Sequence, residues 1–271
     1  MKIKIKYVII AAIVGLLMGI ATFNDLAIAK SIYNEDMIWA HVFKIIGEFP
    51  IYLGLLVFGI TYFHLTSKKS IKNILAVESF VSTFLLIFMP FRYLVKLNII
   101  SMGIITLLSV VLFYFLMRLS YKIKKENYEK IKTVSLICFV GIIAQLSVIY
   151  LMKLMWSRVR FLELENYSSF TRWYIINWFE GNGTSFPSGH TSGATNIMYL
   201  TLFVPLFTDD KKKHYLTEGF CFLFIALTAV SRLVLGKHYL SDVTAAFAIT
   251  YVLHIIVSKS IIDRQKKKKS I

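Results

Sequence analysis

Long apolar runs separated by short polar segments dominate the sequence. Eight of these runs approach or reach the length of about 20 residues that a helix needs to cross a bilayer. They lack the alternation of apolar and polar residues that is typical of membrane strands, so we expect helices. The pattern predicts an all-α fold, a polytopic transmembrane bundle of about eight helices. The predicted spans are 7–26, 46–66, 73–91, 99–118, 133–152, 190–207, 217–235 and 239–258.

Composition supports a membrane protein and argues against other classes. Hydrophobic residues make up 57% of the 271 residues and charged residues 17%, whereas about a quarter is typical of soluble domains. A net charge of +16 suits a nucleic-acid binder, but a mean hydropathy of +0.66 does not, so no nucleic-acid partner is expected. Cys138 and Cys221 lie in apolar runs, which predicts buried thiols. The oligomeric state is left open.

Positive charges are distributed unevenly between the two sides of the predicted bundle. With a cytoplasmic N-terminus, 21 of the 31 Lys and Arg residues fall on the cytoplasmic side, as the positive-inside rule requires. We therefore expect a plasma-membrane protein with both termini in the cytoplasm and a basic tail at 259–271. The start of the chain, with Ala27-Ile28-Ala29, also resembles a signal peptide. Its apolar run exceeds the usual ~7–15 residues, which favours an uncleaved anchor.

Three polar stretches that are distant in sequence reach the extracytoplasmic side in this topology. They occupy 153–160, 187–190 and 231–242. Each alone has a structural explanation: cations that extend to lipid headgroups, a turn at a helix start, or a buried polar pair. Their agreement on one side of the membrane predicts a functional site.

The first two stretches contain the residue types that an oxyanion site needs. Lys153 and Arg160 supply cations that neutralise a phosphate. Ser188 is a good N-cap, and Gly189 lets an anion approach the backbone at a helix start. His190 follows directly and is placed to donate a proton.

The third stretch contains a histidine and a carboxylate at helical spacing. If the last helix begins near His238, Asp242 shares its face. A carboxylate that accepts from one ring nitrogen leaves the lone pair of the other nitrogen free, which activates a nucleophile or base. An Asp near the start of a spanning helix is costly unless paired, so a partner for Asp242 is expected. Arg232 adds a further cation to this stretch.

At these residues the sequence resembles the type-2 phosphatidic acid phosphatase superfamily, the lipid phosphate phosphatases. The family motifs are K-x6-R-P, P-S-G-H and S-R-x5-H-x3-D, and they match 153–160, 187–190 and 231–242. Phe161 stands in place of the proline of the first motif. The resemblance covers about 150–245.

The family fold implies how the chain is organised. It has six core helices, which implies a phosphatase-like core at 73–258 with two additional spans in 1–72. We expect 1–271 to be a single membrane domain.

The resemblance also implies a reaction. It implies an enzyme that hydrolyses phosphoric monoesters or diphosphates of lipids through a phosphohistidine, with no metal and no cofactor. His238 is implied as the nucleophile, Asp242 as the group that orients it, and His190 as the proton donor to the leaving oxygen. The residues implied to hold the phosphoryl oxygens are Lys153, Arg160, Ser188, Gly189 and Arg232. The substrates of family members include undecaprenyl diphosphate, phosphatidic acid and phosphatidylglycerol phosphate.

Two alternatives remain open at the level of the sequence. One is a lipid phosphotransferase that uses the same phosphohistidine, and the other is a non-catalytic lipid binder or transporter, for which degraded motifs would be expected. The aromatic-rich stretch 166–180 also has two interpretations. A helix lying in the outer membrane interface is favoured over a lipid-facing rim that admits the substrate.

Overall fold

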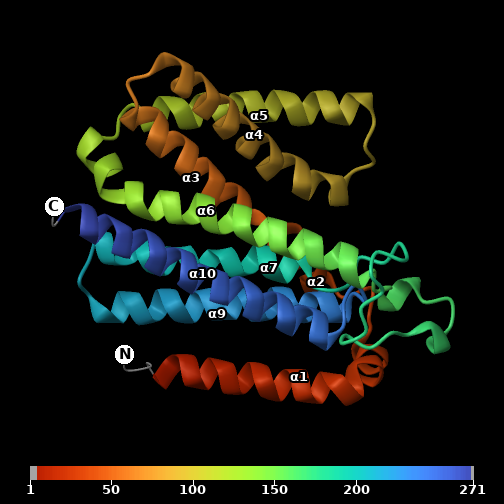
Figure 1. Ribbon diagram of the computed structural model, residues 1–271. Coiled ribbons are helices and arrows are strands. Elements are labelled where there is room, and N and C mark those ends of the chain that lie inside the picture. Colours follow the sequence, from red (N-terminus) through yellow and green to blue (C-terminus); the bar gives the residue numbers. More distant parts are fainter. Residues whose placement is uncertain (1–4, 270–271) are drawn as a thin grey trace. The chain divides into compact units, whose positions relative to one another are not determined.

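The computed structural model describes residues 5–269, and no strand occurs among them. The predicted all-α class is therefore confirmed. Within this described range, seven helical stretches are long and apolar enough to cross a membrane. The long helices, labelled in Figure 1, are α1 (Ile5–Ile32), α3 (Phe49–Leu65), α4 (Lys69–Leu94), α5 (Ile99–Ser120), α6 (Lys125–Trp156), α9 (Lys211–Val234) and α10 (Leu240–Lys269). The short helix α2 (Ile38–Ile46) precedes α3. The first four residues and the last two of the predicted tail lie outside the described range.

The span predicted at 190–207 is not one regular helix. It consists of α7 (Gly189–Thr195), the 3-10 turn η3 (Asn196–Tyr199), α8 (Leu200–Phe203) and the 3-10 turn η4 (Val204–Leu206). The Thr195 hydroxyl donates to the Thr191 carbonyl at 2.7 Å, and such side-chain bonds compete with the backbone ladder of a helix. Pro205 lies in η4 and has no N–H to donate. The apolar run alone did not reveal these interruptions.

The chain divides into two compact units. The first, called the site unit here, contains 1–47, 144–195 and 223–252, and the second contains 48–143, 196–222 and 253–271. Helices α6, α9 and α10 contribute a part to each unit. All three polar stretches predicted from the sequence belong to the site unit.

The second unit has its own apolar core. Helices α3, α4 and α5 follow one another as neighbours (Figure 1). Its core residues are Ile51, Tyr52, Val134, Ile137, Cys138, Ile142 and Tyr199. Gly141 faces the Tyr199 hydroxyl so closely that a Cβ atom would collide with it. Both cysteines of the chain are buried and free, as predicted.

In the site unit, α1 contributes a narrow buried stripe. Its buried residues are Ala21, Asp25 and Ala29, which recur every four positions and so lie on one face. Ala29 packs with Phe161 and Tyr239 in a small core cluster. The other faces carry exposed apolar side chains, as Phe23 illustrates with 82% exposure. Helix α1 therefore exposes a mostly apolar surface and has one buried carboxylate, Asp25.

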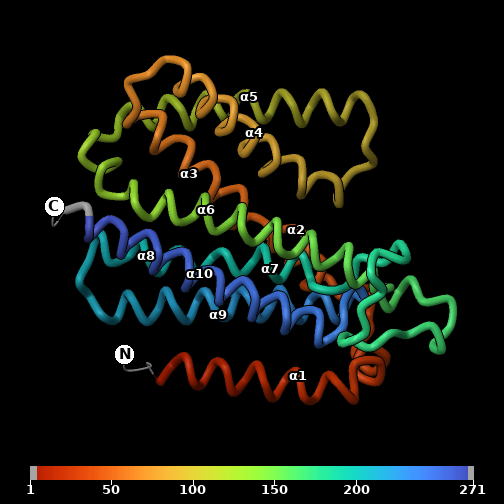
Figure 2. The backbone as a smooth tube through the Cα atoms, viewed as in Figure 1, coloured from red at the N-terminus to blue at the C-terminus, as the bar shows by residue number. Residues whose placement is uncertain are grey.

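The aromatic-rich stretch 166–180 does not form the interfacial helix that was favoured from the sequence. The Asn166 side chain accepts from the backbone N–H groups that follow and starts the 3-10 turn η2 (Tyr167–Ser169). Trp178 and Phe179 have φ values of 49° and 72°, which a continuing α-helix does not contain. The segment runs as irregular chain between α6 and α7 (Figure 2). Its Trp173 contacts α1 through a 3.1 Å hydrogen bond from Nε1 to the Thr22 hydroxyl.

Candidate active site

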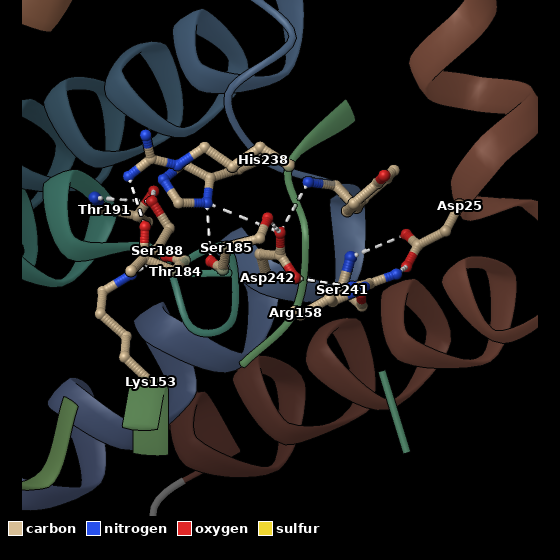
Figure 3. Close-up of polar contacts among 12 residues, drawn as sticks. Asp25, Lys153, Arg158, Thr184, Ser185, Ser188, Thr191, His238, Ser241 and Asp242 are labelled. Carbon is tan, nitrogen blue, oxygen red and sulfur yellow. Dashed lines mark hydrogen bonds and ion pairs between the residues drawn. The ribbon is translucent and has the colours of Figure 1, made fainter. Parts of the chain in front are cut away.

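Residues of the three predicted stretches lie together in one site, as Figure 3 shows for Lys153, Ser188 and His238. Backbone hydrogen bonds join these stretches. The N–H of Ser188 donates to the carbonyl of Asp242 at 3.0 Å. The N–H of Ser185 donates to the carbonyl of Arg158 at 2.8 Å. The chain at 185–188, where the second stretch begins, is thus bonded to both the first and the third stretch.

His238 lies in the turn between α9 and α10 and is 3% exposed. Gly236 makes this turn possible because its φ of +61° is in the left-handed region that glycine adopts readily. Helix α10 begins at Leu240, two residues beyond His238. The nearest partner of His238 Nδ1 is therefore the Ser185 carbonyl oxygen at 2.8 Å, while Asp242 Oδ2 lies at 3.5 Å.

These contacts determine which nitrogen of the His238 ring carries the proton. A carbonyl oxygen only accepts, so Nδ1 carries the proton and Nε2 keeps its lone pair. Burial lowers the pKa of His238 to about 3, the charges of Lys153 and Arg232 act in the same direction, and Asp242 opposes them. His238 is therefore neutral at physiological pH, with one nitrogen available for nucleophilic attack.

Asp242 lies in the first turn of α10 and is fully buried. It accepts from the backbone N–H of Tyr239 at 2.9 Å and from the Ser185 hydroxyl. Its other oxygen pairs with Arg158 Nη1 at 2.6 Å. Arg158 is the partner that the cost of a buried carboxylate led us to expect.

Arg158 lies within the first polar stretch, but the sequence analysis did not predict its role. Its side chain is 1% exposed, and all three guanidinium nitrogens have partners. Nη2 pairs with Asp25 of α1 at 3.0 Å, and Nε donates to the Thr171 carbonyl at 2.9 Å. The guanidinium carbon also lies 4.2 Å from the centre of the Tyr239 ring. The signal for Asp25 was a carboxylate inside an apolar span, which is a functional candidate by default.

The cations of the first motif converge on a residue that the motifs do not include. Lys153 Nζ donates to the Thr184 carbonyl, and Arg160 Nη2 donates to the Thr184 hydroxyl at 2.8 Å. Arg160 also pairs with Glu163 at 3.1 Å. A Cβ atom on Gly189 would lie 3.8 Å from Cε of Lys153. Both cations thus lie beside the chain that leads into the second motif.

The remaining predicted residues lie in the same unit. Ser188 is fully buried, and its hydroxyl accepts from the N–H of Thr191 at 3.3 Å, which makes it the expected cap of α7. His190 is the second residue of α7 and is 9% exposed. Arg232 is 4% exposed, and its charge acts on His238.

Phe161 stands where the first motif of the family has a proline. It begins the 3-10 turn η1 (Phe161–Glu163). Its ring packs edge-on against Tyr33, with centroids 5.6 Å apart. Arg160 nevertheless reaches Thr184, so the cation stays in contact with the chain that leads into the second motif.

Metal ligands do not cluster in the described part of the chain. Between residues 5 and 269, no group of three or more His, Cys, Asp or Glu side chains could hold a metal ion. The charged groups around His238 are Lys153, Arg232 and Asp242.

Part of this chain is similar to a known protein family. Residues 164–266 match the family model of the PAP2 superfamily. The matched region is less than half of the chain, and over this region the chain is similar to the PAP2 superfamily. The second and third motifs lie inside the PAP2 region, whereas the first motif lies just before it. No solved structure matches the chain.

Part of this chain is also similar to a curated protein. It is phosphatidylglycerophosphatase B of Bacillus subtilis (strain 168), which is 31% identical over 78 residues. The match covers 27% of this chain and 37% of the relative. The similarity is therefore to about a third of the length of that protein.

Proposed function

We propose that this protein is a lipid phosphate phosphatase that works through a phosphohistidine on His238. The observation that carries the proposal is the bond between His238 Nδ1 and the Ser185 carbonyl, because it leaves Nε2 as a buried, unprotonated nucleophile. The PAP2 match over 164–266 and the similarity to a phosphatidylglycerophosphatase support the choice of a phosphorylated lipid.

The first step transfers the phosphoryl group from the lipid to the protein. His238 Nε2 attacks phosphorus, a P–N bond forms, and the bond from phosphorus to the lipid oxygen breaks. His190 gives its proton to that leaving oxygen. Asp242 balances the positive charge that the imidazole ring acquires.

The second step returns the protein to its starting state. A water molecule attacks phosphorus, the P–N bond breaks, and His190 takes up the proton of that water. Phosphate leaves, and His238 is again neutral. In both steps the fixed cations Lys153, Arg160 and Arg232 stabilise the charge that spreads over the phosphoryl oxygens.

The location of the site suits a substrate that stays in the membrane. The positive-inside bias supports an extracytoplasmic position of the three motifs. We propose phosphatidylglycerol phosphate, phosphatidic acid and undecaprenyl diphosphate as the substrates to compare, because each presents a terminal phosphate at the surface of a bilayer.

The test is phosphate release by the purified protein in detergent micelles that contain each of these three lipids. EDTA is present, because the proposed mechanism uses fixed cations in place of a metal. We expect release from at least one lipid, and we expect His238→Ala to lower kcat by about 10³-fold or more, as for other removed nucleophiles. A phosphorylated histidine that is labile in acid should form in the wild type and not in the variant.

His214→Ala is the matched control. His214 lies in α9, in the second unit, where its ring contacts the Thr208 carbonyl at 2.8 Å. The control should keep wild-type kcat. Turnover retained in His238→Ala would exclude His238 as the nucleophile, and a phosphorylated lipid in place of free phosphate would identify a phosphotransferase.

A further inference from the structure

We propose that Asp25 of α1 is a positioning residue of this active site. Asp25 forms an ion pair with Arg158 and balances its positive charge. The negative charge of Asp242 can then stabilise a positive charge on His238. The inference rests on the proposed function, because it concerns the charge that His238 gains in phosphoryl transfer. Asp25 lies outside the three motifs and outside the PAP2 region at 164–266.

The position of Asp25 is unusual for a carboxylate. It is 2% exposed, in a helix whose neighbouring Phe23 is 82% exposed. A charged side chain within an apolar helix is costly unless specific partners hold it. On the buried stripe of α1, alanines precede and follow Asp25 at a distance of four residues. Small side chains at these positions let the helix approach its neighbours closely.

The partners of Asp25 are all donors. Arg158 Nη2 lies 3.0 Å from Oδ2, and the backbone N–H of Ser241 lies 2.9 Å from Oδ1. The Ser241 hydroxyl donates to Oδ2 as well. An ionised carboxylate accepts several such bonds, whereas a protonated one has to donate its own proton. The contacts therefore describe an aspartate anion fixed at the first turn of α10.

Arg158 lies between two carboxylates (Figure 3). Nη1 pairs with Asp242 at 2.6 Å and Nη2 with Asp25 at 3.0 Å. One guanidinium and two carboxylates carry a net charge of minus one, by their formal charges. If Asp25 were neutral, Arg158 and Asp242 would cancel each other. Asp25 thus preserves a negative charge beside His238, and that charge acts strongly because the surroundings are buried.

A positioning role and a purely structural role predict different kinetics. If Asp25 only fastens α1 to the bundle, its loss should disturb phosphate binding and turnover together. If it acts through Arg158 and Asp242, its loss should lower turnover, because phosphohistidine formation creates the positive charge. Removal of one negative charge from the site should leave the binding of an anion unchanged or make it tighter.

The experiment compares Asp25→Asn and Asp25→Ala with the wild type on whichever lipid phosphate the wild type turns over fastest. We expect kcat to fall by about 10- to 100-fold, as for partners that orient a ligating group. KM and the inhibition constant of vanadate should stay within about twofold or decrease. Asn24→Ala is the matched control, because Asn24 is exposed and bonds the Ile20 carbonyl of its own helix at 3.0 Å.

A second measurement tests the route of the effect. In an Asp242→Asn background, Asp25→Asn should add little further loss, because the two carboxylates act through the same charge. Independent, multiplicative losses would overturn the proposal. So would wild-type kcat in Asp25→Asn, or weaker vanadate binding in step with the loss of kcat.

A stability measurement separates this inference from the proposed function. Thermal unfolding of Asp25→Asn, Arg158→Met and the double variant should show coupling, because each single change leaves a buried charge without one of its partners. If the stability losses of the two single variants add up in the double variant, the ion pair is excluded, regardless of the activity of the protein. If the pair is coupled but the wild type hydrolyses no lipid phosphate, the proposed function fails, and the catalytic role of Asp25 fails with it.

Discussion

At the scale of single residues, the protonation of His238 depends on one carbonyl group. The Ser185 carbonyl holds the proton on Nδ1, and burial lowers the pKa to about 3. The charges that face this ring belong to Lys153, Arg232 and Asp242. The sequence suggested the carboxylate as the partner of the ring, and it gave no sign of the carbonyl, because backbone groups have no sequence pattern of their own.

The lowered pKa of His238 has a consequence for stability at acidic pH. In the unfolded chain His238 binds a proton below its ordinary pKa of about 6.5, whereas the folded protein keeps it neutral down to about 3. The unfolded state therefore binds more protons in this window, and acid lowers the free energy of unfolding by up to about 1.4 kcal/mol per pH unit.

The measurement is thermal unfolding in detergent at pH 7 and pH 5. We expect the wild type to lose more stability between these values than His238→Gln, which has no titrating ring at this position. Equal losses in the two proteins would show that His238 does not titrate with a lowered pKa.

At the scale of elements, the segment between α6 and α7 does most to assemble the site. It brings Thr184 to both cations of the first motif and Ser185 to His238. Gly183 lies against the backbone of Ser157 and Arg158, where a Cβ atom would collide with main-chain atoms. This glycine thus allows the chain to pass close to the end of α6.

Gly183→Ala should therefore lower both stability and activity. The added methyl group has to displace backbone, at a cost of about 1–3 kcal/mol, and the displacement moves Thr184 and Ser185 away from their partners. Gly219→Ala in α9 is the control, since no atom lies within 4 Å of the place that a Cβ atom would take there. Alanine at this position should raise stability by about 0.5–1 kcal/mol. The check is thermal unfolding together with kcat/KM, and wild-type values for Gly183→Ala would show that the segment adapts.

The elements also show where prediction from sequence succeeds. The long apolar runs predicted the long helices, because a spanning helix must be apolar over its whole length. The regular helix predicted at 190–207 was wrong, because side chains there form hydrogen bonds with the backbone. The helix favoured at 166–180 was also wrong, because this stretch contains residues in the left-handed conformation. The motifs indicated residues such as His238 and Asp242. The apolar span around Asp25 marks this carboxylate as a candidate, but only the packing of α1 shows that its partner is Arg158.

At the scale of the whole molecule, the distribution of charge predicts the orientation in the membrane. The excess of Lys and Arg in alternate connections predicts that 118–132 lies in the cytoplasm and that the segment before α7 lies outside. Because both native cysteines are buried, the chain offers a low background for thiol labelling.

The orientation can be tested with two single cysteine substitutions at exposed positions. Glu180→Cys should react with a membrane-impermeant maleimide in intact cells, and Lys122→Cys should react only after the cells are lysed. The unsubstituted protein is the control for background. The reverse pattern would place the three motifs on the cytoplasmic side and would exclude an extracytoplasmic reaction.

The ion pair between Asp25 and Arg158 connects the first helix to a site that family motifs define without it. A relative that keeps those motifs but has an apolar residue at the place of this aspartate has to balance its arginine in another way. The residues at the positions of Asp25 and Arg158 should consequently change together during evolution, so that relatives without the aspartate also lack the arginine. An acidic residue in the first helix, outside the region that the family motifs define, would then identify relatives that balance this arginine with the same ion pair.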